Sequence, residues 1–481
     1  MNLHLPAIPT LCALLAGCAV GPDYERPAAL KSQPLPKSFA GDWKAAQPAA
    51  HLPRGAWWEI FRDAELNHLE RAATSDNASL AAAVARFNQA RASVDIARSS
   101  FLPQLSLAGA ATRQRTSSNA PQSGHAAGQG YNYSTFTMPL EMGWEPDLWG
   151  RIRRQTEAAG ARLDASADDV EAVKLAIQSA VAADYFALRT LDAELALIAD
   201  TIETYRRSLE LTRNRRKGGI ASDLDVSEAE TQLRSAESQL PALQLHRAKL
   251  AHALATLCGQ PAMTLATPTN PAQLPPPPAV PPTMPSELLE RRPDIATAER
   301  QMAAANADIG VAKSAFFPRI VFNGLAGFQS INAGTVFNWP SRVWAVGPTL
   351  ELPIFTGGRN TAKLAAARAA YDETVARYRQ TALAAFQEIE DQLAAQRLLG
   401  KQLDAETAAL ASARHTQEIA NNRYRAGLVT YLEVAAAQSI ALDRNRAVVR
   451  LQGERCLATV GLIKALGGGW RANSEATPAQ R

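Results

Sequence analysis

The feature that most restricts the fold of this chain is an internal repeat. Segment 215–226, Arg-Arg-Lys-Gly-Gly-Ile-Ala-Ser-Asp-Leu-Asp-Val, aligns with segment 423–434, Arg-Tyr-Arg-Ala-Gly-Leu-Val-Thr-Tyr-Leu-Glu-Val. Farther upstream, segment 94–103 matches segment 309–318. A repeated sequence indicates a repeated supersecondary unit. We therefore predict a tandem duplication in which both halves have the same order of elements.

A proline-rich segment separates the two halves. Residues 274–285 contain seven prolines, a composition typical of a stiff, extended linker. The predicted order is a signal peptide (1–17), a lipid-anchored segment (18–56), a first repeat (57–259), the linker (260–286), a second repeat (287–467) and a C-terminal tail (468–481).

Each half is predicted to contain a helix, two strands and a long helical hairpin. The first helix ends near a Phe-x-Pro motif, which occurs at Phe101 and again at Phe316, because proline stops a helix. Apolar and polar residues then alternate, as in 140–145 and from Trp344 to Leu352, and this alternation predicts strands.

The hairpins are predicted from uninterrupted helical sequence. No proline occurs in 151–216, so a single helix of roughly 100 Å is expected there, with a returning helix that Pro241 should kink. Apolar residues spaced alternately by three and four predict coiled-coil packing between the two helices. These residues are Leu191, Leu195, Ile198, Ile202, Tyr205 and Leu209, then Val226, Ala229, Leu233, Ala236, Leu240 and Leu243. The second half repeats this arrangement from Arg359 to Leu466, and alanine, roughly one residue in five, permits close helix packing.

The amino terminus predicts export from the cytoplasm. A short apolar segment ends in Leu15-Ala-Gly-Cys18, which is typical of a secretory signal and resembles a bacterial lipobox, so Cys18 is the expected lipidation site. An ordinary signal peptide with an incidental cysteine is the alternative. Among the remaining cysteines, the repeat places the equivalent of Cys258 at Leu466, too far along the helix from Cys456 for a disulfide. We expect two buried free thiols.

Composition and motifs exclude several classes of protein. The 50 basic and 46 acidic residues are nearly balanced, which argues against a strongly basic nucleic-acid-binding protein. No internal segment has the ~18–20 apolar residues of a membrane-spanning helix. The sequence has no glycine-rich phosphate loop, no G-x-S-x-G motif and no histidine pair with metal-binding spacing. We therefore predict no enzymatic activity, no metal site and no cofactor apart from the lipid on Cys18.

The four predicted strands leave an open edge on each side of their sheet. Open edges are not viable in lipid, so the strands form either a soluble sheet or a barrel to which several chains contribute. Aromatic residues near the strands favour the barrel, because aromatic girdles mark the interfaces of membrane barrels. They include Trp144, Trp149, Trp339 and Trp344.

A set of motifs accompanies these features: Leu15-Ala-Gly-Cys18, Gly21-Pro-Asp-Tyr-Glu-Arg-Pro27, Trp57-Trp58, Arg291-Arg-Pro-Asp-Ile295, Ala315-Phe-Phe-Pro318, Leu352-Pro-Ile-Phe355, Gly357-Gly-Arg359 and Arg423-Tyr-x-x-Gly427. With these motifs the sequence resembles the TolC-like outer membrane efflux factors, in their lipoprotein (NodT/OprM-like) branch. The resemblance implies a mainly α protein with a small β part. It implies a homotrimer with a 12-stranded β-barrel, four strands per chain, joined to a long periplasmic α-helical coiled-coil tunnel.

The resemblance also implies a function and partners. The expected protein is the outer membrane exit duct of a tripartite efflux system for drugs or other small molecules, working with a periplasmic adaptor (membrane fusion) protein and an inner-membrane pump. Export of proteins or of metal ions through the same kind of channel is an alternative. A lipid-anchored coiled-coil scaffold without a pore is a second alternative, from another class.

A tunnel needs a gate, and the hairpin turns at Gly219 and Gly427 are its expected position. Resemblance to the family makes Asp225, Glu433 and Tyr424 the gate candidates, with Asp223 as a substitute that could equally face solvent. The sequence departs from the family pattern at Val429 and Ala436, which stand where charged partners are expected.

Both acidic positions also have a simpler interpretation. Ser222-x-x-Asp225 and Thr430-x-x-Glu433 each fit a helix capping box, which would make helix capping their main role. The turn residues Gly219, Ile220, Gly427 and Leu428 are expected to contact the adaptor, with plain turn chemistry as the alternative.

Overall fold

The computed structural model describes residues 19–27, 55–119, 130–262, 274, 276–278 and 291–468. The predicted signal peptide and Cys18 lie outside these residues, as do most of the predicted linker and of the C-terminal tail. The chain forms two compact units, one made of 1–28, 87–166 and 298–378, the other of 29–86, 167–297 and 379–481. Each unit therefore combines segments from both halves of the sequence.

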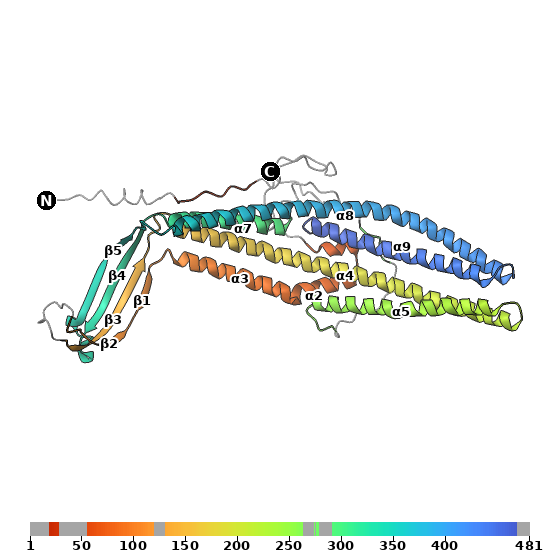
Figure 1. Cartoon of the computed structure of the whole chain (residues 1–481), viewed down its shortest axis with the longest axis horizontal. Coiled ribbons are helices and arrows are strands. Elements are labelled where there is room, and N and C mark those ends of the chain that lie inside the picture. Colours follow the sequence, from red (N-terminus) through yellow and green to blue (C-terminus); the bar gives the residue numbers. More distant parts are fainter. Residues whose placement is uncertain are drawn as a thin grey trace, which may run out of the picture. The chain divides into compact units, whose positions relative to one another are not determined.

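The first unit contains one antiparallel sheet (Figure 1). Its strands are β1 (Gln104–Leu107), β2 (Ala110–Arg115), β3 (Asn132–Trp144), β4 (Arg319–Ser330) and β5 (Arg342–Glu351). Strands β1 and β2 both pair with β3 in one continuous register, so they form a single row and the sheet has the four rows that the sequence predicts. The pairing of β3 with β4 joins the two halves of the chain.

The sheet has two chemically different faces, because side chains alternate along each strand and paired residues share a face. One face is apolar and carries Leu105, Leu107, Met138, Leu140, Met142, Trp144, Ile320, Phe322, Phe328, Trp344, Val346 and Leu350. The other carries most of the polar side chains, including Gln104, Ser106, Thr112, Gln114, Thr137, Glu141, Arg319, Asn323, Thr349 and Glu351. Tyr133 also lies on the polar face, opposite the apolar face that carries Trp144 and Trp344.

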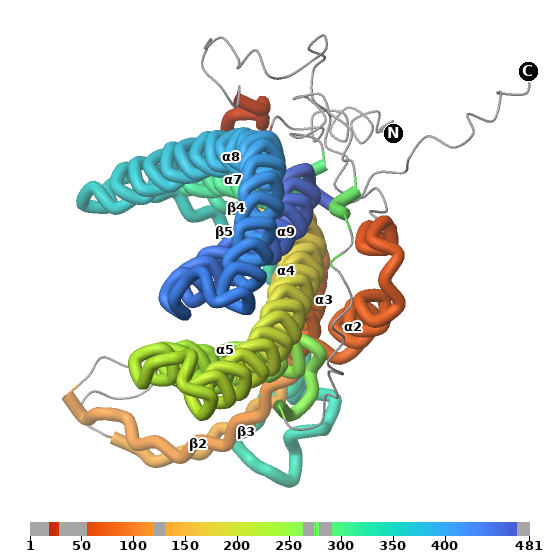
Figure 2. The backbone as a smooth tube through the Cα atoms, turned by 90° about the vertical axis from the view of Figure 1, so that its right-hand side faces the viewer, coloured from red at the N-terminus to blue at the C-terminus, as the bar shows by residue number. Residues whose placement is uncertain are grey.

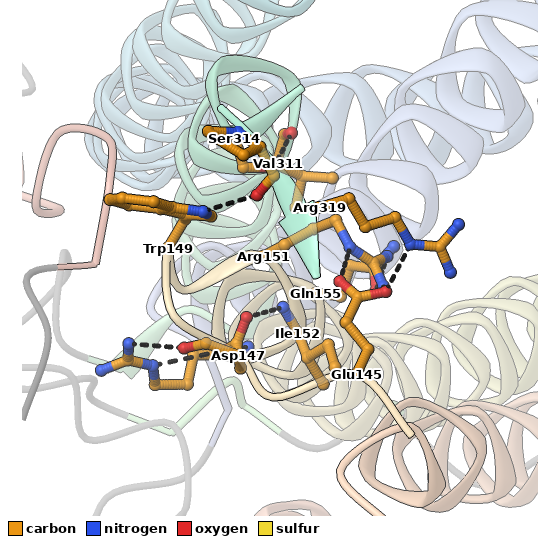
Figure 3. A network of polar contacts seen from close by, with 11 residues as sticks. Glu145, Asp147, Trp149, Arg151, Ile152, Gln155, Val311, Ser314 and Arg319 are labelled. Atoms are coloured by element: carbon orange, nitrogen blue, oxygen red, sulfur yellow. Dashed lines mark hydrogen bonds and ion pairs between the residues drawn. The ribbon is translucent and has the colours of Figure 1, made fainter. Parts of the chain in front are cut away.

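A polar network fixes the junction between β3 and the first long helix (Figure 3). The Glu145 carboxylate accepts hydrogen bonds from Arg151 at 2.9 Å and from Arg319 at 2.7 Å, which connects the two halves. Asp147 caps the helix, because its Oδ1 accepts from the backbone N–H of Ile152 at 2.9 Å. Trp149 Nε1 donates to the Pro318 carbonyl at 2.7 Å, so this tryptophan is held at the junction.

The amino-terminal residues that the structure describes are fixed to the same unit. The Val20 N–H donates to the Trp149 carbonyl at 3.0 Å, and Asp23 pairs with Arg154 at 2.8 Å. The Tyr24 hydroxyl donates to the buried Glu299 carboxylate at 2.8 Å. The residues just after Cys18 are therefore docked beside the strand-to-helix junction.

The helices follow the predicted duplication. They are α2 (Ala64–Asp76), α3 (Ala78–Ser99), α4 (Arg151–Lys217) and α5 (Asp223–Leu257), then α7 (Pro293–Ser314), α8 (Arg359–Arg425) and α9 (Tyr431–Ala465), with short 3₁₀ turns η1 (Trp57–Phe61), η2 (Ala333–Thr335) and η3 (Trp339–Ser341). Both α4 and α8 have 67 residues, and both α5 and α9 have 35. Helix α5 continues through Pro241. None of the helices in the described ranges is long and apolar enough to cross a membrane.

The second unit has two hydrophobic clusters. The first surrounds Trp57 and Phe61 and contains both Cys258 and Cys456, which are buried and free, as the sequence predicts. The second contains eight of the twelve residues of the predicted coiled-coil pattern of α4 and α5, and the other four are partly buried and pack against it. It also includes Tyr424, Tyr431 and Val434 of the other hairpin, so the two hairpins (Figure 2) share one core near their turns.

One buried residue in this unit breaks the apolar pattern. Glu70 is 0% exposed on α2, and neither of its carboxyl oxygens has a hydrogen-bond partner in the described part of the chain. It lies next to Leu69, whose carbonyl accepts a hydrogen bond from the Cys258 thiol at 3.6 Å. An unpartnered carboxyl group in such a core is costly to ionise.

Candidate gate at the hairpin tips

The two hairpin turns have the same backbone geometry. Gly219 has a φ of 74° and Gly427 a φ of 75°, which is the left-handed conformation that glycine adopts most readily. In each turn the N–H of the following residue donates to a carbonyl of the last helical turn, from Ile220 to Arg215 at 2.9 Å and from Leu428 to Arg423 at 3.0 Å. This bond pattern ends a helix in a Schellman-type cap. The side chains of Ile220 and Leu428 are 69% and 70% exposed, so both tips present an apolar group to their surroundings.

Asp225 caps its own helix and also binds the other hairpin. Its Oδ2 accepts from the Ser222 N–H at 2.9 Å, and the Asp225 N–H donates to the Ser222 hydroxyl at 3.2 Å, which confirms the predicted capping box. Its Oδ1 accepts from the Tyr431 N–H at 2.9 Å. Tyr431 is the first residue of α9, so one carboxylate satisfies free N–H groups at the start of two helices.

Arg215 and Tyr424 make a second connection between the hairpins. The Arg215 guanidinium donates to the Arg425 carbonyl at 2.9 Å and lies 4.8 Å from the centre of the Tyr424 ring. The Tyr424 hydroxyl donates to the Thr212 hydroxyl at 3.2 Å. A cation at the C-terminal end of α8 interacts favourably with its terminal carbonyls, and the ring face adds a cation–π contact.

Behind these contacts lies a small polar cavity of about 240 Å³. Two almost fully buried side chains, those of Tyr431 and Gln438, line this cavity. Tyr431 is 0% exposed, and its hydroxyl donates to the amide oxygen of Gln438 at 3.4 Å. Gln438 is 2% exposed, and its Nε2 donates to Ser208 on α4 at 3.5 Å. The Tyr431 and Tyr424 rings meet edge to face with centroids 5.6 Å apart. The hairpins are therefore joined by polar contacts on both sides of an aromatic pair.

The other two acidic candidates have weaker contacts. Glu433 lies 3.7 Å from Arg423, and both side chains are about half exposed. The expected capping box at Thr430 and Glu433 is wrong, because the Thr430 side chain makes no capping hydrogen bond. Asp223 pairs with Arg216 at 2.6 Å and is 79% exposed, so it faces solvent.

The environment of Asp225 favours its ionised form. Burial by itself raises the pKa of this carboxyl, but hydrogen bonds from the Tyr431 and Ser222 N–H groups and the Ser222 hydroxyl, together with the charge of Arg215, outweigh it and hold the pKa below its ordinary value. A carboxylate that stays ionised remains a strong acceptor for the cross-hairpin bond.

The sequence identified part of this site and missed four of its residues. It selected Asp225, Tyr424 and both turn glycines, but not Arg215, Thr212, Tyr431 or Gln438. The one available signal was the repeat itself, because Arg215 aligns with Arg423 and a basic residue in the last helical turn is a common capping feature. Nothing in the sequence indicated that Tyr431 and Gln438 are buried together.

Comparison with known proteins assigns the family. The model of the family described as outer membrane efflux protein matches residues 69–260 and 284–468, which is most of the chain. The chain belongs to the outer membrane efflux protein family. Members of this family are transport proteins found in the outer membrane, and the protein is accordingly an outer membrane protein with a periplasmic helical part.

Relatives of known function belong to efflux pumps. Outer membrane protein OprJ of Pseudomonas aeruginosa is 35% identical over 458 residues, covering 95% of this chain and 94% of that protein. The solvent efflux pump outer membrane protein SrpC of Pseudomonas putida is 34% identical over 459 residues, covering 95% of this chain and 96% of that protein.

Solved structures show the same fold for one copy. The outer-membrane channel OprN has a TM-score of 0.84 at 30% identity, covering 94% of this chain and 100% of that one. The open state of the MtrE outer membrane channel of Neisseria gonorrhoeae has a TM-score of 0.77 at 28% identity, covering 94% and 98%. The sheet and the paired long hairpins are thus those of efflux-channel subunits.

Proposed function

We propose that three copies of this chain close one outer membrane channel that serves as the exit duct of a tripartite efflux pump. The observation that carries this proposal is the sheet, which has one apolar face, one polar face and two outer rows that pair on one side only within the described residues. Edge-to-edge pairing of several copies would satisfy both edges, turn the apolar face to lipid and leave the polar face lining a pore.

Drugs and other small organic molecules are the cargo that the relatives support. Their names assign antibiotic, toluene and solvent efflux to the proteins that match nearly the whole of this chain. The polar face of the sheet carries both acidic and basic groups, Glu141, Arg319 and Glu351, so it does not favour one sign of charge.

The hairpin tips are the proposed gate and adaptor contact. Within one copy, the Asp225–Tyr431 and Arg215–Arg425 hydrogen bonds hold the two hairpins together. Opening of the pore would require the tips of the two hairpins to separate. The exposed Ile220 and Leu428 side chains, beside Gly219 and Gly427, give a periplasmic adaptor an apolar surface to bind. The inner-membrane pump then delivers cargo through the adaptor.

Planar-bilayer recording tests the proposal. The full-length protein, purified as a trimer, is expected to insert and to give small, mostly closed conductance steps. A scaffold without a pore would insert by its lipid and give no steps, even when the Asp225–Tyr431 bond has been removed by substitution. That outcome would overturn the channel function.

The lipid anchor is a separate prediction. We expect labelled palmitate to be incorporated into the protein and to be lost completely in Cys18→Ser, because the thiol is the acceptor in a lipobox. The substitution Cys12→Ser, within the predicted signal peptide, is the matched control and should keep the label. Absence of label from the wild-type protein would show that residues 1–18 are an ordinary signal sequence, and label remaining in Cys18→Ser would show that another residue carries the lipid.

A further inference from the structure

Arginines are unevenly distributed between the two faces of the sheet. The described strands contain four arginines, and three of them, Arg113, Arg115 and Arg342, lie on the apolar face. Their positions follow from register, because Arg113 pairs with Ser134, Arg115 with Asn132 and Arg342 with Phe328. The fourth, Arg319, lies on the polar face at the opposite end of the sheet and pairs with Glu145.

All three arginines lie at the end of the sheet where β3 begins, β4 ends and β5 begins. Below them, the same face is apolar from Met138 and Phe328 down to Trp144 and Ile320. The boundary is marked by Trp339, which is 73% exposed and stacks on the Arg342 guanidinium at 4.0 Å. An aromatic ring at this position is typical of a lipid–water interface.

Among the described strand residues, none on this face neutralises the arginines. The strand residues that share it include no aspartate or glutamate, whereas Glu141 and Glu351 both lie on the polar face. None of the ion pairs between described residues involves Arg113, Arg115 or Arg342. Exposed arginines above an apolar band, without acidic partners, form an unsatisfied anion-binding surface.

We propose that Arg113, Arg115 and Arg342 bind the phosphate groups of phosphorylated lipid at the outer surface of the membrane. This inference rests on the proposed function, since it needs the apolar face to contact lipid. Closing the barrel would bring the β5 edge of one copy, with Arg342, beside the β2 edge of the next, with Arg113 and Arg115. The guanidinium fork matches phosphate geometry, and the apolar band below takes the acyl chains.

The test compares two triple variants of the full-length trimer. Binding of lipid A that carries both phosphates is measured in detergent micelles by native mass spectrometry. The variant Arg113→Gln/Arg115→Gln/Arg342→Gln is expected to bind about a hundredfold more weakly, because each arginine near an anionic surface is worth roughly fivefold in binding. The matched variant with lysine at all three positions keeps the charge and should retain most of the binding.

Further outcomes separate this inference from the channel function. Lipid A with one phosphate removed should bind more weakly to the wild type, and millimolar inorganic phosphate should not displace the intact lipid. Equal binding by the wild type and the glutamine variant, or full displacement by inorganic phosphate, would overturn the proposal. Bilayer conductance of the glutamine variant should equal that of the wild type, because the three arginines do not face the pore. A conducting channel with unchanged lipid binding would refute this inference alone.

Discussion

The substitution Asp225→Ala is expected to raise the open fraction of the channel on the order of tenfold. It removes the acceptor of the Tyr431 N–H and the capping carboxylate of α5 in every copy. A charge-assisted hydrogen bond at a partly exposed site is worth about 1.4 kcal/mol, which corresponds to a tenfold change in an equilibrium. The readout is the open probability of single trimers in planar bilayers.

Two matched variants make this prediction specific. Asp225→Asn keeps one acceptor oxygen but loses the charge and the second acceptor, so its open fraction should lie between those of the wild type and Asp225→Ala. Glu433→Ala changes the equivalent position of the second half, where the carboxylate lies 3.7 Å from a half-exposed arginine, and such a pair contributes little. If Glu433→Ala opened the channel as much as Asp225→Ala, closure would depend on acidic charge at the tips in general and not on the bond to α9.

The pH dependence of this link has a definite sign. Burial raises the pKa of Asp225 in the folded protein, but its hydrogen bonds and the charge of Arg215 lower it by more, so the net shift is downward. A carboxyl group with a lowered pKa stabilises the folded protein at pH values above its ordinary pKa near 4. This stabilisation is lost as the pH falls through the pKa of the folded state. Protonation of Asp225 is therefore not expected to open the gate between pH 5 and 8.

The substitution Glu70→Gln is expected to stabilise the protein at neutral and alkaline pH. Burial raises the pKa of Glu70 to about 9, whereas an unfolded glutamate titrates near 4.3. Because the pKa of Glu70 is higher in the folded state, its contribution to folding stability is fully present at pH values below the unfolded pKa. That contribution is lost as the pH rises toward 9. The loss of folding free energy reaches roughly 4 kcal/mol at pH 7, and the glutamine variant avoids it.

The measurement is the difference in Tm between the variant and the wild type from pH 4 to pH 9. The two proteins should be alike near pH 4 and diverge steadily above it. Burial raises the pKa values of Cys258 and Cys456 to about 11, so these neighbouring thiols do not titrate in this range. Asp76→Asn, at the exposed end of the same helix, is the control. A glutamine variant that is less stable at every pH would contradict the prediction.

Periodicity in the sequence was enough to predict the architecture. The spacing of Leu191 to Leu243 predicted the α4–α5 packing, and the repeat extended it to α8 and α9. The apolar residues Trp344, Val346 and Leu350 are separated by even numbers of positions, which predicted a strand with one apolar face. This prediction was possible because successive side chains of any strand point to opposite faces. Glu70 could not be predicted in this way, since a glutamate within an amphipathic helix normally faces solvent.

The site was predictable in position but not in its bonds. The sequences around Asp225 and Glu433 look equivalent, and each fits a capping box. Only the packing of one hairpin against the other decides that Asp225 reaches the Tyr431 N–H and that the Thr430 side chain makes no cap. The two halves are therefore symmetric in sequence pattern and asymmetric in chemistry, a difference that depends on contacts between residues about two hundred positions apart.

The equal lengths of α4 and α8, 67 residues each, restrict how this chain can change during evolution. Deleting one residue from one of these helices moves its end by about 1.5 Å and rotates it by about 100°. Either change would separate the Asp225 carboxylate from the Tyr431 N–H, which now lie 2.9 Å apart. Insertions and deletions in the two helices are therefore expected to be inherited in matched pairs, while unmatched length changes accumulate elsewhere in the chain.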